Sequence, residues 1–406
     1  MYYVGIDVAK EKHYVSVINE EGDFVTKPFW IYSDGVGLNE LVKKLNDISW
    51  TYDDFILALE STGAYSENIY EYFTELGFKI ILLNSYQTAK FRDLTTMKKV
   101  KNDAIDSLVI AGLIKSNQYK ESYVSNEEYQ SLKVLVRLKS SLSDKIKSIK
   151  REISTVMAII NPEINKVFPN IFTKSALAII KEYPTAIDLQ SVTVKKLTKI
   201  FRHIKGNNFN EDKAKYLIDL ANLTIYSGRA KDARSLMITY NIRTLELLCQ
   251  EKDEVEIAIQ NILDIDIDNK PNSPIDNLKT IPGVSVKTIA AILGECGKLS
   301  RFESVKAFIG YLGLYPTLYQ SGNSSVTGRL AMRGIPIAKH ALYMSAVSSV
   351  RHNIEMLKLF RDKVSSGKSK KEALIIIAKK LATIMYSIFK YNTPYNPNRV
   401  FIPYRK

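Results

Sequence analysis

The sequence has 406 residues, 46% of them hydrophobic, which is enough for two or three domains with buried cores. Its 57 Lys and Arg residues against 43 Asp and Glu give a net charge of +14. From Lys279 onward there are 21 basic and 5 acidic residues, whereas the first 278 residues hold 36 and 38, so the positive excess lies in the last third. Such a concentration of positive charge indicates a polyanionic partner, most often nucleic acid.

Several classes of protein are disfavoured by the composition. No stretch approaches the roughly 18 uncharged apolar residues of a membrane span, and the N-terminus starts as a strand without a signal peptide, which favours a cytoplasmic protein. The two cysteines, Cys249 and Cys296, lie far apart and the histidines are scattered, which excludes a disulfide scaffold and a zinc motif. Disorder is expected in short connections and in the tail, 392–406.

The first 120 residues show strands followed by alternating helices and strands. Strands are expected at 2–6, 13–19, 24–32, 55–59 and 79–83. Amphipathic helices are expected after Ser33 or Asp34 and over 65–76. Three antiparallel strands leading into alternating helices and strands predict an α/β RNase H-like (RuvC-like) domain over 1–120.

A helical period begins near Glu127. Apolar residues from Leu135 to Ile160 recur every three or four positions, which predicts a long coiled-coil-like helix with a basic outer face. A second long helix is expected over about 230–263, with a compact helical insertion at about 161–227, so that 121–270 forms a helical arm. The heptads favour equally a hairpin packed within one monomer and an arm that dimerises. A polar linker, 265–273, follows.

Residues 275–391 are expected to form an α-helical C-terminal domain, with 392–406 as its tail. Its first element, 281–285 (IPGVS), resembles a helix-hairpin-helix, in which backbone N–H groups of a glycine turn contact a phosphate. Gly283 and Ser285 are therefore candidate phosphate contacts. A plain connection between two helices explains the same turn equally well.

Four carboxylates could carry chemistry. Asp7 ends the first strand, Glu60 ends the fourth, and Asp103 and Asp106 share one face at the start of an apolar helix. Each alone has an ordinary explanation, as a turn residue, a helix cap or a dipole partner. Together, acids at strand ends and on one helix face are costly unless divalent cations compensate them, and two such cations can cleave a phosphodiester.

The chain resembles the insertion-sequence transposases of the family named for insertion sequence one-ten. The resemblance rests on 5–10 (GIDVAK), 60–65 (ESTGAY), 101–106 (KNDAID), 281–283 (IPG), 313–316 (GLYP) and 319–322 (YQSG). Departures from the family pattern are Asn102 in place of a common Thr, and Ile335, Pro336 and Lys339 where a small polar residue and an arginine are usual.

The resemblance implies a DNA transposase and recombinase in which Asp7, Glu60, Asp103 and Asp106 bind Mg²⁺, at two sites, with Mn²⁺ as a substitute. It further implies a serine nucleophile at Ser321, a structured guide RNA that pairs with element and target DNA, and a homo-oligomer, dimer or tetramer. From the residues alone Ser321 is a turn residue in a polar loop, 320–328, with Ser324 and Ser325 as competitors.

Basic residues complete the candidate nucleic-acid surface. Its members are Lys98, Lys99, Lys101, Arg329, Arg333 and Lys339, together with Gly283 and Ser285. Three alternatives stay open: a RuvC-like junction resolvase or nuclease without a covalent intermediate, an actin-like ATPase or sugar kinase, and a nucleic-acid-binding protein without catalysis. The second lacks the glycine expected after Asp7 in such phosphate loops.

Overall fold

The computed structural model describes residues 1–61, 65–95, 102–202, 204, 209–265, 273–321, 324–331 and 333–400. For 265, 317–321 and 324–329 it describes the backbone alone. The chain forms two compact units, Met1–Val124 and Ser125–Lys406, here called the N-terminal unit and the second unit. The expected linker at 265–273 lies almost entirely outside the described residues.

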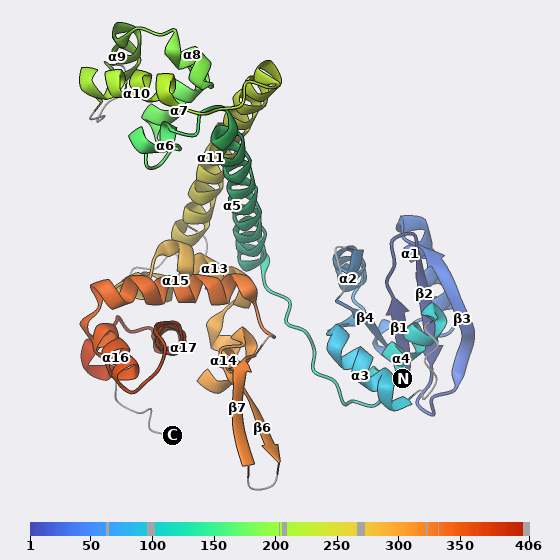
Figure 1. The fold of residues 1–406 in the computed structure, drawn as a ribbon. Helices are drawn as coiled ribbons and strands as arrows, with labels where there is room; N and C mark the ends of the chain where they lie inside the picture. The colour runs from blue at the N-terminus through green and yellow to red at the C-terminus, as the bar shows by residue number, and fades with distance from the viewer. Residues whose placement is uncertain are drawn as a thin grey trace. The chain divides into compact units, whose positions relative to one another are not determined.

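A mixed five-stranded sheet forms the centre of the N-terminal unit (Figure 1). Its strands are β1 (Tyr2–Asp7), β2 (Lys12–Ile18), β3 (Phe24–Tyr32), β4 (Phe55–Glu60) and β5 (Lys79–Leu83). The order is β3-β2-β1-β4-β5, with β1, β2 and β3 antiparallel and β4 and β5 parallel to β1. Each strand lies within a residue or two of the sequence prediction.

Helices cover both faces of this sheet. One face packs on α1 (Gly35–Asn46) and α2 (Tyr65–Glu75), whose buried Leu41 and Phe73 join the strand residues Val4 and Ile6 in one core cluster. The other face packs on α4 (Asp103–Lys115), with α3 (Ser85–Thr95) beside it. Asp34 caps α1, because its Oδ1 accepts a hydrogen bond from the backbone N–H of Gly37 at 2.8 Å.

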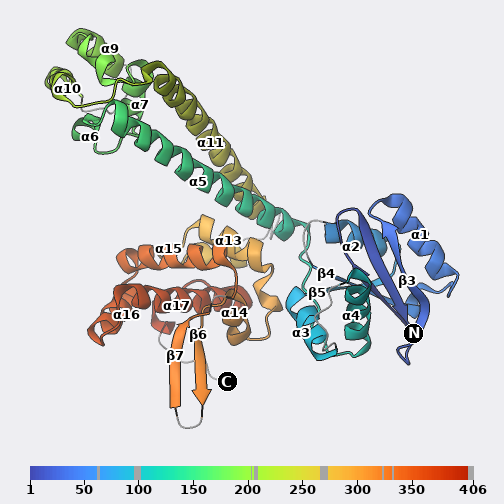
Figure 2. The same ribbon diagram turned by 45° about the vertical axis from the view of Figure 1, so that its right-hand side comes forward.

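Two long helices form the arm that the second unit contains. They are α5 (Glu127–Ile160) and α11 (Lys231–Ile265), which run side by side in both views (Figures 1 and 2). The insertion between them holds α6 (Ile164–Val167), α7 (Lys174–Glu182), α8 (Ala186–Gln190), α9 (Val194–Arg202) and α10 (Glu211–Leu223). The two helices thus pack on each other within one chain, which is one of the two arrangements that the heptads favour.

The apolar side of the arm changes partners along its length. Toward the insertion, Ile153 of α5 and Ile242 of α11 share a cluster with α6–α10. Toward the other end, Leu132 of α5 and Ile259 of α11 belong to the core of the C-terminal helices. Leu138, which the heptad pattern places inside, is 44% exposed, because this part of α5 turns Leu132 and Val136 toward α13 (Val286–Cys296).

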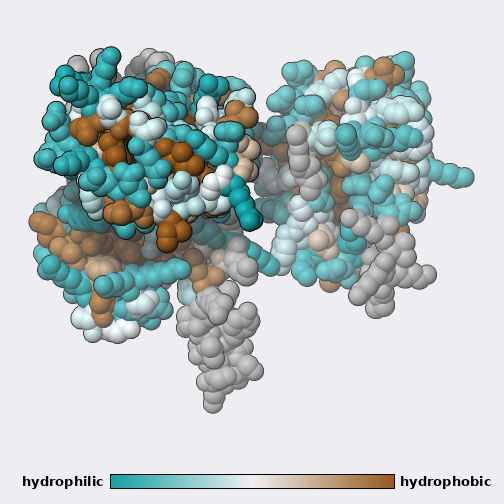
Figure 3. Space-filling model, turned by 45° about the horizontal axis from the view of Figure 1, so that its top comes forward, coloured by the Kyte–Doolittle hydropathy of each residue, from teal (hydrophilic) through white to brown (hydrophobic). Residues whose placement is uncertain are grey.

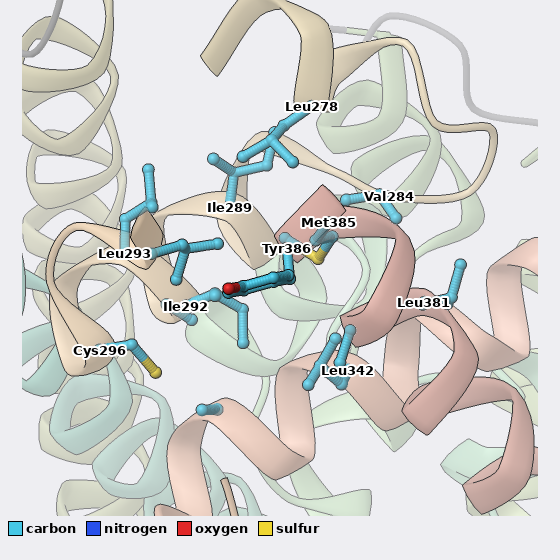
Figure 4. Packing of buried hydrophobic residues seen from close by; sticks show 14 of the residues in the cluster. Leu278, Val284, Ile289, Ile292, Leu293, Cys296, Leu342, Leu381, Met385 and Tyr386 are labelled. Carbon is cyan, nitrogen blue, oxygen red and sulfur yellow. The ribbon is translucent and has the colours of Figure 1, made fainter. Parts of the chain in front are cut away.

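A helical core follows the arm. Its helices are α12 (Pro274–Lys279), α13, α14 (Val305–Leu312), α15 (Pro336–His352), α16 (Ile354–Ser365) and α17 (Lys370–Tyr391). Figure 4 shows Ile292 of α13, Leu342 of α15 and Met385 of α17 directed into one apolar interior. The hydroxyl of Tyr386 donates to the Phe302 carbonyl oxygen at 2.7 Å, which satisfies a polar group inside this core.

Ion pairing also joins the arm to this core. The guanidinium of Arg137 on α5 donates to Glu295 of α13 through Nε at 2.7 Å and a terminal nitrogen at 2.9 Å. The Glu295 side chain is 2% exposed. A two-point contact of this kind fixes both the distance and the orientation of the two helices.

The tail beyond α17 is ordered over 392–400, contrary to the expectation of disorder. Val400 is 3% exposed, and the Asn353 amide donates to the Tyr395 hydroxyl at 2.9 Å. Burial of these side chains on the C-terminal core holds the segment in place. Among the described residues, no helix combines the length and the apolar character that crossing a membrane requires.

Two strands interrupt the helices of the C-terminal core. β6 (Pro316–Ser321) and β7 (Ser324–Leu330) pair antiparallel from Pro316 opposite Leu330 to Ser321 opposite Ser324. Their root is anchored next to the core, because Leu314 and Ala331 are each 4% exposed and the Ala331 N–H donates to the Tyr315 carbonyl at 2.9 Å. Residues 320–328, expected as a polar loop, thus belong largely to this hairpin.

Candidate active site

The fold brings four acidic residues to one edge of the sheet. Asp7 is the last residue of β1 and Glu60 the last residue of β4. Since β1 and β4 are parallel neighbours, with Ile6 opposite Leu59, both acids leave the sheet at the same end. Asp103 and Asp106 lie in the first turn of α4.

Close packing sets the position of α4 against β1. A Cβ atom on Gly5 would lie 2.0 Å from the carbonyl oxygen of Ser107 and 2.5 Å from the backbone nitrogen of Ala111, so only glycine permits this approach. The hydroxyls of Ser16 on β2 and Ser107 on α4 are hydrogen-bonded at 2.8 Å in the buried interface. These contacts place the first turn of α4 beside Asp7.

Electrostatics show that the acids act on one another. The pKa of Asp7 is raised to about 6, first by burial and then by the negative charges of Asp106, Asp103 and Glu60, against an opposite effect of Arg92. Ionisation of Asp7 therefore costs free energy, because its carboxylate is partly buried and lies near other negative charges. The four carboxylates therefore form one electrostatic cluster.

Helix α3 contributes two residues to the site that the sequence analysis did not identify. The Thr88 hydroxyl donates to Glu60 Oε2 at 2.9 Å, and an Arg92 guanidinium nitrogen lies 2.8 Å from Asp106 Oδ1. Asp106 is 5% exposed, so Arg92 compensates a charge that is almost out of water. Thr88 and Arg92 are four residues apart in the helix after the last strand, a spacing that places both on one face.

The chemistry of this cluster suits a hard divalent cation, which prefers carboxylate oxygen ligands. The raised pKa of Asp7 agrees with this, because it comes from burial and, after that, from nearby negative charge that a cation would neutralise. In the described part of the chain, no three His, Cys, Asp or Glu side chains converge closely enough to enclose a metal ion, and Asp106 pairs with Arg92 instead. The donor set thus fits a cation, with Arg92 in the position of a competing charge.

The helix-hairpin-helix-like turn packs against protein at its glycine. Gly283 has φ +89°, and a Cβ there would lie 2.4 to 2.6 Å from atoms of Ser349 on α15. The Ser349 hydroxyl donates to the Pro282 carbonyl at 3.0 Å. Ser285 is exposed and caps α13. Close packing on α15 is sufficient to explain Gly283, and Ser285 stays a prediction as a phosphate contact.

The basic candidates have different surroundings. The ammonium group of Lys339 donates to the carbonyl oxygens of Arg333 at 2.9 Å and Ala331 at 3.4 Å, so it braces the root of the β6–β7 hairpin. Arg333 is exposed. Arg329 lies in β7, where the backbone alone is described, and the candidates Lys98, Lys99 and Lys101 lie outside the described residues.

The serine candidate lies at the far end of this hairpin. Ser321 is the last residue of β6 and pairs with Ser324 of β7, while Ser325 pairs with Gln320. All three candidate serines thus lie close together in the backbone of one hairpin end. Pairing of β6 with β7 determines which residues lie opposite these serines. The loop that the sequence predicts would not determine this.

Two family profiles match separate parts of the chain. A DEDD transposase profile matches residues 4–162, and a profile described as the transposase IS116/IS110/IS902 family matches 275–361. The chain belongs to the IS110 family of transposases. This IS110-family chain therefore has an RNase H-like DEDD domain at its N-terminus, as the order of strands and helices along the sequence predicted, followed by mostly helical structure.

Curated relatives show the same affiliation. The pilin gene-inverting protein of Moraxella bovis is 35% identical over 121 residues, which is 29% of this chain and 38% of that protein. The insertion element IS110 protein of Streptomyces coelicolor is 21% identical over 79% of this chain and 78% of its own length. The insertion element IS900 protein of Mycobacterium paratuberculosis is 20% identical over 97% of each.

The two matches divide the candidate residues of this IS110-family chain. The first covers the four carboxylates with Thr88 and Arg92, and the second covers Ser321 with the basic residues of the hairpin and α15. The first profile, that of a DEDD transposase, also suggests a divalent metal.

Proposed function

We propose that this protein is a metal-dependent DNA recombinase that moves its own insertion sequence by cutting and rejoining DNA through a serine. The observation that carries the proposal is the electrostatic cluster of Asp7, Glu60, Asp103 and Asp106 in a chain of a transposase family. The strongly basic last third would attract the phosphates of the substrate.

In this proposal the four carboxylates hold Mg²⁺, at two sites, with Mn²⁺ able to replace it. Bound cations supply charge neutralisation at the reacting phosphodiester and polarise its oxygens. The protein contributes the alignment: β1 and β4 fix Asp7 and Glu60, and the packing of α4 on Gly5 fixes Asp103 and Asp106. Thr88 orients Glu60 through its hydroxyl.

Ser321 is the proposed nucleophile. Its hydroxyl oxygen attacks the phosphorus and a serine–phosphate ester forms. The bond from phosphorus to the leaving deoxyribose oxygen breaks, and that oxygen takes up one proton in exchange for the proton that the serine hydroxyl releases. Reversal with a different DNA hydroxyl restores the serine and joins the new strand. Support comes from the family pattern around 319–322 and from a strand end that holds the residue away from the helical core.

We also propose that a structured guide RNA pairs with element and target DNA, which would leave sequence recognition to base pairing. Support comes from family membership and from the positive excess of the second unit. Treatment of the purified complex with ribonuclease is expected to abolish joining at the specific site. Undiminished specific joining by protein free of RNA would refute this part of the proposal.

An oligomer is the final component. Exposed apolar side chains follow one side of α11, at Leu236, Tyr240, Leu247 and Ile257. The first three are spaced by four and seven residues, as on a coiled-coil face. On the face of the molecule that Figure 3 presents, apolar residues lie among hydrophilic ones. Leu247→Glu is expected to reduce the oligomer to monomer in sedimentation, whereas Lys147→Glu on α5 is expected to leave it intact.

A denaturing-gel assay tests the central claim. End-labelled DNA spanning one element end is incubated with full-length protein, Mg²⁺ and RNA transcribed from the flank of the gene, and then denatured. A labelled protein–DNA adduct is expected with the wild-type chain and with Ser324→Ala, and none with Ser321→Ala or Asp7→Asn.

The outcomes separate the alternatives. Strand cutting by the wild type without any adduct would instead indicate a RuvC-like nuclease that uses water. An adduct that survives Ser321→Ala but disappears with Ser324→Ala or Ser325→Ala would move the nucleophile to that residue.

A further inference from the structure

A strip of aromatic and basic side chains leads across the sheet from the carboxylate cluster to an open edge. Asp7 of β1 lies opposite Tyr14 of β2, and Tyr14 lies opposite Trp30 of β3. Directly opposed residues on antiparallel strands share one face of a sheet. Trp30 is thus two interstrand spacings, each about 4.8 Å, from Asp7 on the same face.

The outer end of this strip is exposed. Trp30 and Tyr32 are 42% and 51% exposed on β3, which is the edge strand of the sheet. Their rings are nearly perpendicular, at 80°, with centroids 5.0 Å apart. The ammonium of Lys12, the residue opposite Tyr32, lies 3.8 Å from the Trp30 ring centroid and 5.4 Å from that of Tyr32.

One face of the Trp30 ring is therefore in contact with the Lys12 ammonium. A cation over an exposed ring is bound more weakly than a nucleobase stacked on the same ring. An arriving base can displace the Lys12 ammonium, which then remains within reach of the adjoining phosphate. Lys10 is exposed in the turn between β1 and β2, just before Lys12, and the acidic residue between the two lysines is Glu11.

These features select an unpaired strand as the occupant. Bases of a duplex are stacked on each other and present no face to a side chain, whereas an unpaired base can stack on an aromatic ring next to a basic group. Phosphates also need positive charge on the way to a carboxylate cluster that would repel them, and Lys10 and Lys12 provide it beside Asp7.

The geometry points to Trp30, Tyr32 and Lys12 as a stacking platform for unpaired DNA, which holds one strand at the edge of the sheet as it enters the carboxylate site. This inference rests on the proposed function, since it names the form of DNA that this site receives. Trp30 is a positioning residue here, because it would hold a base about 10 Å from Asp7, two interstrand spacings away.

The chain has two tryptophans, which makes a direct test available. Trp50 is 86% exposed, and Trp50→Phe leaves Trp30 as the single tryptophan, which excitation at a wavelength that tyrosine does not absorb observes alone. Full-length Trp50→Phe protein in EDTA, which prevents cleavage, is titrated with a fifteen-nucleotide oligo-dT, with an abasic strand of equal length and with a duplex. The oligo-dT is expected to quench Trp30, and the abasic strand and the duplex are not.

Affinity provides a second measurement. Trp30→Leu is expected to weaken oligo-dT binding about tenfold in fluorescence anisotropy, as loss of one stacked base would. Trp50→Phe is the matched control and should bind as the wild type does. Tyr32→Leu should weaken binding in the same direction, and circular dichroism verifies that each variant is folded.

Several results would overturn the platform. Equal quenching by the abasic strand would show that charge alone, without base stacking, holds the DNA. Stronger quenching by oligo-U would assign the platform to RNA. A blue shift of the Trp30 emission that depends on protein concentration without DNA would assign the platform to a second copy of the chain. A wild type that forms the serine adduct while Trp30 is not quenched would remove the platform and leave the proposed function standing. Quenching of Trp30 in a protein that never forms an adduct would keep the platform and contradict the proposed serine mechanism.

Discussion

Arg92 on α3 and Asp106 on α4 form an ion pair, with 2.8 Å between a guanidinium nitrogen and Oδ1, inside the carboxylate cluster. The Asp106 side chain is 7% exposed and that of Arg92 is 28% exposed. The arginine provides at one carboxylate the positive charge that a divalent cation would provide for the cluster. In the absence of a metal ion, the Arg92 guanidinium therefore compensates part of the negative charge at this site.

Replacement of this arginine tests that role. Arg92→Met removes the positive partner that this contact gives the buried Asp106 charge and is expected to destabilise the metal-free protein by about 3 kcal/mol, near the lower end of the range for a broken buried pair. Saturating Mg²⁺ is expected to restore part of this loss in thermal unfolding. Lys90→Met, which breaks the exposed pair with Asp93, should cost less than about 0.5 kcal/mol. A deficit that Asp106→Asn does not relieve would contradict the assignment.

The pKa of Asp7 gives the metal-free fold a pH dependence of definite sign. The folded protein binds this proton up to about pH 6, whereas the unfolded chain releases it near pH 3.8. Stability therefore falls as pH rises between these values and is constant above them with respect to this group. Asp7→Asn should remove that slope and raise the melting temperature at pH 7.5 by about 2 °C.

Cation binding should show the opposite dependence, because protons compete for the same carboxylate. The Mg²⁺-induced rise in melting temperature is expected to be larger at pH 8 than at pH 5.5 and to be absent in Asp7→Asn. Asp23→Asn, in an exposed turn, is the matched control. An equal Mg²⁺ response at both pH values would separate Asp7 from the metal.

Gly5 links sheet packing to the site. Gly5→Ala would drive a methyl group into the backbone of α4, at 2.0 Å from the Ser107 oxygen, and is expected to destabilise the protein by about 3 kcal/mol. The Mg²⁺ response should fall with it, since Asp103 and Asp106 move with the helix. Gly35→Ala, with no atom within 4 Å of the new Cβ at the start of α1, should be neutral or slightly stabilising. Equal stability of the two variants would disprove the close approach.

The pair between Arg137 and Glu295 controls how the arm joins the C-terminal core. Arg137→Met leaves a 2% exposed carboxylate without this partner and should lower the unfolding midpoint by the equivalent of about 3 kcal/mol. Lys147→Met, which breaks an exposed pair with Asp144, should have almost no effect. Recovery in the double variant with Glu295→Gln would verify that the buried charge is the cause.

Local patterns predicted most of the N-terminal unit, because its strands and helices satisfy their own periodicities. Asp7, Glu60 and Asp106, which the structure brings together, are candidates from the sequence because acids are unusual at the ends of apolar segments. Arg92 was not, since an arginine on a helix has nothing unusual about it until the fold brings Asp106 to it. Tertiary contacts also override heptads, which is why Leu138 is exposed.

The hairpin was missed for a related reason. Residues 320–328 are polar and small, a composition typical of loops, and pairing of β6 with β7 is a property of two segments together. The ordered tail at 392–400 depends likewise on a distant surface, where Tyr395 meets Asn353.

The hairpin has one anchored end and one remote end, and the serine is at the remote one. From Pro316 to Ser321 the strand extends roughly 17 Å, so a tilt of roughly 10° at the root would carry Ser321 through roughly 3 Å. Lys339 braces that root through the Arg333 and Ala331 carbonyl oxygens. In the proposed reaction, a small rotation next to the core would therefore move Ser321 by about the distance over which a nucleophile approaches its phosphate.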